Sequence, residues 1–314
     1  MTRNPPPIDL RADPAIEVLG AHKHYGAHHA VDGIDLRIER GEILGLIGHN
    51  GAGKSTLFKM ILGLTPATSG EIRVGGTSVS GRDFRTARRH LGYLPENVVL
   101  YDNLSGLETL RFFARLKAAP LAQCAALLDQ VGLASAGNRP VREYSKGMRQ
   151  RLGFAQALLG SPQVLLLDEP TNGLDPQAIR DFYATLRRLQ AQGVTIVITS
   201  HILAELQERV DRLAILASGR LQALGSVQAL RERTHMPLAI DLVLAPADVP
   251  AAQQAVARLL GITPLPTPEG LRLTCPRELK VATLAALAPL GTRLADVQIH
   301  EPSLEDVYFG LREL

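Results

Sequence analysis

The stretch Gly48-His49-Asn50-Gly51-Ala52-Gly53-Lys54-Ser55-Thr56 lies between the apolar run Ile43–Ile47 and a segment, 54–62, whose apolar residues have helical spacing. Its glycines, lysine and serine have the spacing of a phosphate-binding loop between a strand and a helix. Such a loop turns its N–H groups inward, and the following helix start favours anions. We therefore expect the stretch to bind nucleotide phosphates, with Lys54 on the terminal phosphates and Ser55 on Mg²⁺. A glycine turn with a chance lysine would not explain the strand before it and the helix after it.

Two carboxylates, Asp168 and Glu169, follow a second buried run, Val164–Leu167. Paired carboxylates at the end of a buried strand are costly unless they share a cation or a proton. A metal ion removes that cost, so we expect Asp168 to bind Mg²⁺ directly or through water. Glu169 is then the candidate base that orients or deprotonates an attacking water. For the pair taken alone, a structural acidic turn is the alternative.

A histidine follows the next predicted strand, 194–199. Most single histidines are structural, but this strand is expected to lie beside the one that ends at Asp168. We expect His201 to contact the terminal phosphate and to hold the attacking water. Together these three motifs predict a nucleotide hydrolase without specifying its kind.

The segment 144–151, with the sequence YSKGMRQR, opens a predicted helix and resembles the signature of ABC-type ATPases. Residues 16–225 as a whole resemble an ABC nucleotide-binding domain. The resemblance implies ATP and Mg²⁺ as cofactors, Tyr25 as the residue that stacks on adenine and Glu96 in the loop that senses Mg²⁺. It also implies a loop at the dimer interface, formed by Gly173, Leu174 and Asp175.

In this family the signature of one subunit closes over the ATP bound by its partner, so the resemblance implies a homodimer. The residues that would face the partner's ATP are Ser145, Lys146, Gly147 and Met148. A helix start offers N–H donors to phosphate, which is the physical basis of this closure. The family usually has glutamine at Glu96 and glycine and glutamine at Lys146 and Met148. Glu96 can still bind Mg²⁺, but it adds negative charge beside the phosphates.

One subgroup of the family is especially similar, namely the ATPase subunit of the transporter that serves copper-sulfur centre maturation of nitrous-oxide reductase. The similarity lies in four segments, 93–98, 104–117, 144–160 and 298–308. It implies an integral-membrane subunit, a periplasmic accessory protein, and a position on the cytoplasmic face of the cell membrane. The alternatives are a generic exporter ATPase for a drug, lipid or polysaccharide, a soluble ABC ATPase of DNA repair or translation, and a regulatory ATP-binding module.

Composition excludes several other classes. The 314 residues include 46% hydrophobic residues, which is enough for a large core, and the formal net charge of +3 is too small to argue for nucleic acid. The sequence has no run of roughly 18 apolar residues that would span a bilayer. We expect residues 1–14 to form a disordered tail.

The order of apolar runs predicts an α/β fold with two domains. Alternating strands and helices indicate a largely parallel sheet in residues 15–233, interrupted by a helical subdomain at about 100–160. By resemblance, this domain has the ABC architecture of a mixed sheet core, an antiparallel β region and a helical subdomain. Residues 238–314 have their own order of strands and helices and predict a small α+β domain, whose role the sequence leaves open.

Four histidines, His22, His24, His28 and His29, flank Tyr25. A copper site is one interpretation. We prefer ordinary exposed histidines, because two of them are adjacent in sequence instead of facing one ion.

Overall fold

The computed structural model describes residues 13–200, 203–233, 236–257, 259, 261–303 and 305–306. The chain divides into two compact units, the first ending at Leu224 and the second beginning at Gly225. The predicted boundary falls later, between residues 233 and 238, because helix α8 (Val227–Arg233) belongs to the second unit. None of the helices in the described ranges is long and apolar enough to cross a membrane.

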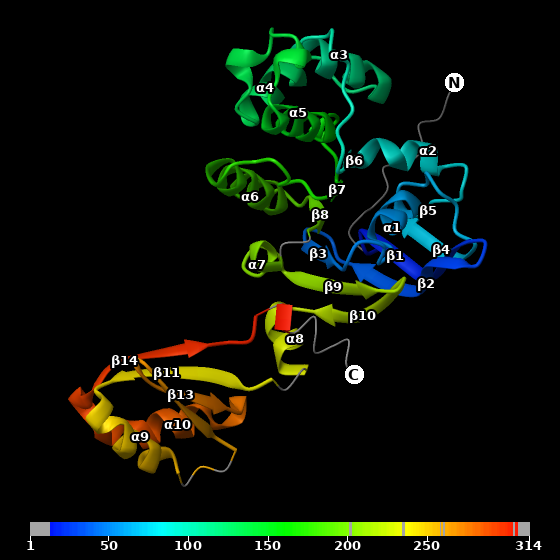
Figure 1. Ribbon diagram of the computed structural model, residues 1–314. Helices are drawn as coiled ribbons and strands as arrows, with labels where there is room; N and C mark the ends of the chain where they lie inside the picture. The colour runs from blue at the N-terminus through cyan, green and yellow to red at the C-terminus, as the bar shows by residue number, and fades with distance from the viewer. Residues whose placement is uncertain are drawn as a thin grey trace. The chain divides into compact units, whose positions relative to one another are not determined.

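A six-stranded sheet forms the centre of the first unit (Figure 1). Its strands, in spatial order, are β10 (Arg220–Gly225), β9 (Arg212–Ala217), β3 (Ile43–Ile47), β8 (Thr195–Thr199), β7 (Val164–Leu167) and β6 (Leu91–Leu94). The five strands from β9 to β6 pair in parallel. Every residue of β3, β7 and β8 is buried, as expected for parallel strands covered on both faces.

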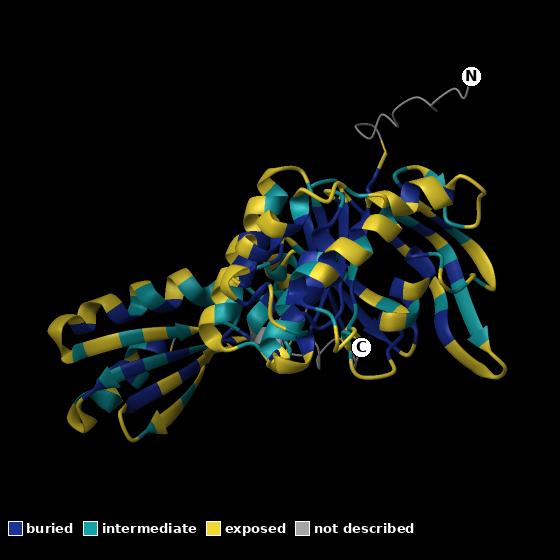
Figure 2. Ribbon diagram, turned by 90° about the horizontal axis from the view of Figure 1, so that it is seen from above, coloured by how far each residue is buried: buried dark blue, intermediate teal, exposed yellow. Residues whose placement is uncertain are grey.

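A second, antiparallel sheet packs with the first around one hydrophobic core. Its strands, in spatial order, are β2 (His28–Ile38), β1 (Ile16–Tyr25), β4 (Ser69–Val74) and β5 (Thr77–Ser78). Helix α1 (Lys54–Ile61) contributes Leu57, Phe58 and Met60 to this core. Figure 2 shows the strands buried beneath helices whose outer faces are exposed. The predicted mixed sheet and antiparallel region are therefore confirmed.

The remaining helices of the first unit are α2 (Phe84–Ala87), α3 (Gly106–Lys117), α4 (Gln123–Gln130), α5 (Lys146–Leu158), α6 (Pro176–Ala191) and α7 (Leu203–Leu206). Helices α3, α4 and α5 pack on one another and form the predicted helical subdomain (Figure 1). Ser105 and Glu108 start α3 by capping each other's backbone N–H, as their spacing predicts.

The second unit contains a four-stranded antiparallel sheet with two helices, α9 (Val249–Val256) and α10 (Lys280–Leu287), on one face, and it begins with the separate helix α8. The strands of the sheet, in spatial order, are β12 (Thr263–Thr267), β13 (Gly270–Cys275), β11 (Leu238–Leu244) and β14 (Leu294–His300). The chain order β11-α9-β12-β13-α10-β14 with this strand order is the ferredoxin-like arrangement. The sequence pattern did not reveal β12, because its two prolines confine it to the sheet edge.

Ser303 and Asp306 form the predicted cap near the C-terminus. The Ser303 N–H donates to the Asp306 carboxylate at 2.8 Å, and the Asp306 N–H donates to Ser303 Oγ at 3.1 Å. The expected end of this helix near residue 314 lies outside the described residues, as does almost all of the predicted tail, 1–14.

Lys117, at the end of α3, gives the fold a pH-dependent component of stability. Its Nζ donates to the Leu159 carbonyl at 2.6 Å, and burial lowers its pKa to about 8. In the unfolded chain the pKa of lysine is about 10.4, so between pH 8 and 10 the unfolded state binds more protons and stability rises with pH.

We predict that the free energy of unfolding of the wild type, minus that of Lys117→Met at the same pH, rises between pH 8 and pH 10. The expected rise is on the order of 2 kcal/mol. Urea unfolding at a series of pH values measures this difference. Because the variant is the reference at each pH, the titration of all other groups cancels. Parallel curves for the two proteins would contradict the assignment.

Candidate active site

The loop between β3 and α1 has a backbone that only glycine accommodates at two positions. A Cβ on Gly48 would lie 2.5 Å from the Leu216 carbonyl oxygen, and one on Gly53 would collide with the Ala30 carbonyl. Gly53 also has φ 103°, in the left-handed region. The loop therefore packs tightly against β2 and β9, and this packing fixes the path of its backbone.

Lys54 lies at the start of α1 and is buried, with its Nζ directed back over the loop. Nζ donates to the Gly48 carbonyl at 2.5 Å and lies 3.3 Å from the His49 carbonyl. Burial lowers the pKa of Lys54, while the carboxylates of Glu169, Asp168 and Glu96 oppose that shift. Carboxylates that the sequence analysis selected from two separate segments, 168–169 and Glu96, are thus close enough to act on one ammonium group.

Asp168 follows β7 and is held by the neighbouring strand. Thr199, the last residue of β8, donates from Oγ1 to Asp168 Oδ1 at 2.7 Å, and the Asp168 N–H donates to the Leu94 carbonyl at 2.8 Å. Only 4% of Asp168 is exposed. The carboxylate is therefore buried in a fixed orientation.

Glu169 has a strained backbone. Its φ of 48° is in the left-handed region, which for a residue with a Cβ costs on the order of 1–3 kcal/mol. Its N–H donates to the same Thr199 Oγ1 at 2.8 Å. Thr199 therefore positions both carboxylates. The sequence analysis gave Thr199 no role, because its side chain meets Asp168 only through the pairing of β7 with β8.

Tyr93 of β6 and Glu96, two residues beyond the end of that strand, border the carboxylates. Burial raises the pKa of Tyr93 to about 12, and the charges of Asp168 and Glu96 add to that shift. Glu96 itself is exposed. Tyr93 therefore remains a neutral hydroxyl at physiological pH and adds no further negative charge beside the carboxylates.

The phosphate loop borders a hollow of about 180 Å³. The lining residues are His28, Ala30, His49, Asn50, Gly51, Ala52, Gly53, Lys54, Ser55 and Thr56. Tyr25 is not among them, but it pairs with His28 across the β1–β2 hairpin and is 51% exposed. His28 is a lining residue that the sequence analysis did not assign to this site.

Ser145 begins α5, the helix of the signature segment. Its Oγ accepts from the Met148 N–H at 3.2 Å, and its side chain is exposed. Lys146 is exposed as well, while Gly147 and Met148 are half-buried. None of the four lines the hollow at the phosphate loop. The signature therefore does not contribute to the phosphate site of its own chain.

The loop at residues 173–175 packs against the start of α5. A Cβ on Gly147 would lie 3.0 Å from the Gly173 carbonyl oxygen, and Gly173, with φ 82°, is in the left-handed region. Asp175 has a local role, because its Oδ1 accepts from the Ala178 N–H at 2.9 Å and caps α6. In addition, Gln150 of α5 donates to the Pro170 carbonyl at 3.0 Å. The signature helix and the segment after Glu169 are thus linked. His201, the remaining predicted site residue, lies outside the described residues.

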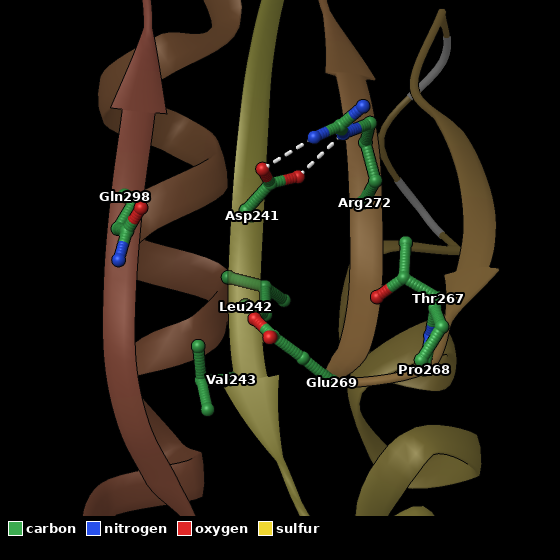
Figure 3. A pocket seen from close by; sticks show the side chains of 8 residues that line it. All are labelled: Asp241, Leu242, Val243, Thr267, Pro268, Glu269, Arg272 and Gln298. Carbon is green, nitrogen blue, oxygen red and sulfur yellow. Dashed lines mark hydrogen bonds and ion pairs between the residues drawn. The ribbon is translucent and has the colours of Figure 1, made fainter.

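The second unit contains a larger hollow, of about 350 Å³, on the face of its sheet turned away from α9 and α10 (Figure 3). Its main charged pair is internal, because Arg272 donates twice to the Asp241 carboxylate, at 2.6 Å each. His300 Nε2 lies 3.1 Å from the same carboxylate. With the Asp241 carboxylate occupied in this way, Glu269 is the remaining charged lining residue, and the hollow lacks the converging groups found around Lys54.

The residues around Lys54 fit Mg²⁺ and a polyphosphate. Backbone N–H groups of the loop and the start of α1 suit phosphate oxygens. The hydroxyl of Ser55 and the buried carboxylate of Asp168 are the hard oxygen ligands that Mg²⁺ prefers. Strand β3 leads through the loop into α1, and the carboxylates follow β7, which is separated from β3 in the sheet by β8. This arrangement defines a phosphate-loop nucleotide hydrolase.

Comparisons with known proteins identify the family. A family model described as ABC transporter matches residues 31–172. A daunorubicin resistance ATP-binding protein of Streptomyces coeruleorubidus is 37% identical over 96% of each chain. A linearmycin resistance ATP-binding protein of Bacillus subtilis is 32% identical over 92% of this chain and 95% of its own. A solved structure of the ATP-binding subunit of an ABC transporter is 33% identical, with a TM-score of 0.65, and the match covers 70% of this chain and 92% of that one.

The chain therefore belongs to the ABC transporter ATP-binding family and has its nucleotide-binding fold. It is an ATPase whose hydrolysis of ATP is coupled to transport.

Two substitutions separate binding from hydrolysis. We predict that Lys54→Ala weakens ATP binding about 10–100-fold, because charged hydrogen bonds to phosphate are lost. Glu169→Gln keeps ATP affinity but lowers the rate of phosphate release about 10²–10⁴-fold, because the amide cannot accept a proton. Binding of a fluorescent ATP analogue and a phosphate-release assay measure the two effects. Full turnover by Glu169→Gln would show that this carboxylate is not the base.

Proposed function

We propose that this chain is the ATP-binding and hydrolysing subunit of an ABC exporter whose cargo is a small antibiotic-like molecule. The observation that carries the chemistry is the convergence of Asp168, Glu169 and Glu96 on the buried ammonium of Lys54. The class of cargo is supported by two relatives, each of which aligns over more than nine tenths of both chains and is named for resistance to an antibiotic.

In the proposed reaction, the loop N–H groups and Lys54 bind the phosphates, while Ser55, Asp168 and Glu96 hold Mg²⁺. Bound Mg²⁺ would neutralise charge that develops on the phosphates. Glu169 accepts a proton from the attacking water. Its strained backbone, and the hydrogen bond that its N–H donates to Thr199 Oγ1, fix the backbone that carries this carboxylate before ATP arrives. We assign the remaining water contact to His201 on sequence grounds.

We further propose that two copies of the chain enclose two ATP molecules. The first turn of α5 has N–H groups without partners inside the helix, and its Ser145 is exposed. These donors do not reach the phosphate hollow of their own chain, so a second chain is needed to bring them to the terminal phosphate. The loop at residues 173–175 would lie at the same interface, because it packs beside Gly147.

We predict that Ser145→Arg blocks ATP-dependent dimerisation and lowers hydrolysis to the level of Glu169→Gln, while the single chain still binds ATP. The long side chain would occupy the place of the partner's phosphate. Size-exclusion chromatography in the presence of ATP measures the dimerisation. For this measurement the chain also carries Glu169→Gln, which traps the dimer. Ser145→Ala is the control, because it also loses the helix cap, at a cost of about 0.5–2 kcal/mol, but adds no bulk. A Ser145→Arg protein that dimerises normally would exclude the shared site.

A membrane-spanning partner is proposed to dock on the segment from residue 99 to α3. Large apolar side chains are exposed there, with Val99 at 87% and Leu116 at 69%, and the ring of Tyr101 contacts that of Phe112 at 5.5 Å. Exposed apolar groups in such density are typical of a protein contact. A chain docked in this way would lie on the cytoplasmic face of the cell membrane.

Co-expression of the chain with a membrane subunit encoded beside it tests both the partner and the cargo. We predict that the pair lowers daunorubicin accumulation in cells and that Glu169→Gln abolishes this effect. Leu116→Asp is expected to abolish export while the purified chain keeps its basal ATPase activity, because the substitution breaks only the docking surface. Val281→Asp, at a similarly exposed position (77%) in the second unit, is the matched control. Unchanged export with Leu116→Asp would exclude this surface.

The resemblance to the ATPase of nitrous-oxide reductase maturation remains a second hypothesis, based on sequence segments alone. Neither of the two antibiotic-resistance relatives reported above refers in its name to copper or nitrous oxide. If this hypothesis holds, deletion of the gene leaves drug accumulation unchanged and produces nitrous-oxide reductase that lacks its copper-sulfur centre. A periplasmic accessory protein would then be a further partner.

A further inference from the structure

Away from the catalytic carboxylates, His22, His24 and Asp32 come together on the hairpin of β1 and β2. His22 Nδ1 lies 3.2 Å from Asp32 Oδ1, and one ligand atom from each of the three residues lies within 4.8 Å of the others. His22 and His24 are two positions apart in β1, so they project from the same face. The pairing of β1 with β2 is irregular between Ala21 and His24, and bulges of this kind redirect side chains.

His24 has an unsatisfied polar atom in this cluster. Its Nε2 is enclosed and has no hydrogen-bond partner in the described part of the chain. A buried nitrogen without a partner costs about 1–3 kcal/mol. The ring is held in place, because it stacks on His29 with 3.9 Å between centroids and meets the edge of His22 at 5.7 Å. A cation beside His24 would supply the missing partner.

Asp32 is oriented from outside the cluster. Its Oδ2 accepts from Arg220 at 2.7 Å, and its N–H donates to the Gly219 carbonyl at 2.8 Å. With Oδ2 held by Arg220, the second carboxylate oxygen of Asp32, Oδ1, faces His22 Nδ1 at 3.2 Å. Outer hydrogen bonds of this type orient the ligands of metal sites.

Two further contacts complete the surroundings. His29 Nδ1 lies 3.9 Å from Asp32 Oδ1, so a small rotation of its ring would make it a fourth ligand. On the other side, a Cβ on Gly33 would lie 3.4 Å from Cε1 of His22, which means that the His22 ring packs directly on backbone. The cluster is thus built from both strands of the hairpin.

We propose that these residues bind one divalent transition-metal ion, with His22, His24 and Asp32 as ligands and His29 as the fourth. Two or three imidazole nitrogens and one carboxylate oxygen suit Zn²⁺ and related ions, at bond lengths of about 2.0–2.2 Å. Mg²⁺ prefers all-oxygen surroundings, so this site is separate from the Mg²⁺ site beside Lys54. This proposal departs from the sequence interpretation of these histidines as ordinary exposed residues, because Asp32 and the strand pairing add what their spacing lacks.

The bound ion would cross-link β1 to β2 next to the tip of the hairpin. That tip carries Tyr25, the proposed adenine contact, and His28, which lines the hollow at the phosphate loop. Fixing the hairpin lowers the entropy lost when ATP binds, so the ion strengthens ATP binding. This consequence rests on the proposed function, whereas the metal site itself does not.

Titration of the full chain with Zn²⁺, in the presence of excess Mg²⁺, tests the site by calorimetry. We expect one Zn²⁺ per chain, loss of that binding in His24→Ala and Asp32→Asn, and an affinity about 10–100-fold weaker in Arg220→Ala. His90→Ala removes an exposed histidine outside the cluster and is the matched control. Circular dichroism checks that each variant is folded.

Two results would overturn the proposal. In the first, the wild type binds no more Zn²⁺ than a double variant that carries both His22→Ala and His24→Ala. In the second, the single variant His24→Ala binds Zn²⁺ as the wild type does. Visible absorption of bound Co²⁺ provides a second readout, with bands expected in the wild type and in His90→Ala but not in His24→Ala. ATP affinity with and without Zn²⁺ is measured separately. Failure of ATP binding would contradict the proposed function and leave the metal site intact.

Discussion

The buried ammonium group of Lys54 sets the requirements for the rest of the first unit. Burial opposes its charge, and carboxylates from the ends of two strands, β6 and β7, compensate. Because β7 and β8 pair in parallel, Thr199 lies where it can bond to both Asp168 and Glu169. The central sheet thus gathers charges that would each be costly to bury alone. A polyphosphate with Mg²⁺ fits this arrangement because it brings both signs of charge.

The same region connects hydrolysis to the surfaces that partners would contact. Gln150 of α5 donates to the Pro170 carbonyl, directly after the proposed catalytic residue Glu169, and Gly147 lies against Gly173. A change at the terminal phosphate can therefore move the signature helix through contacts within one chain. Helix α3, which carries the exposed Leu116, packs on α5. This gives a physical route between ATP hydrolysis and a membrane subunit docked on α3.

The proposed metal site would add a control on the adenine side. Asp32 is shared between His22 and Arg220, so the cluster ties the hairpin of β1 and β2 to the first residue of β10. The phosphate loop also contacts β2, where Gly53 meets the Ala30 carbonyl. A metal ion in the hairpin and a nucleotide in the loop would therefore act on the same strand.

The sequence by itself determined the features that depend on neighbours along the chain. The spacing from Gly48 to Ser55, the apolar runs that became β3 and β7, and the Ser105–Glu108 cap are all local patterns, so they could be predicted from the sequence. Only the tertiary structure decided what strand pairing brings together. The hydrogen bonds of Thr199, the lining role of His28 and the cluster around Asp32 join residues whose spacing carries no signal. Strand register and bulges place such groups, and these depend on packing across the whole core.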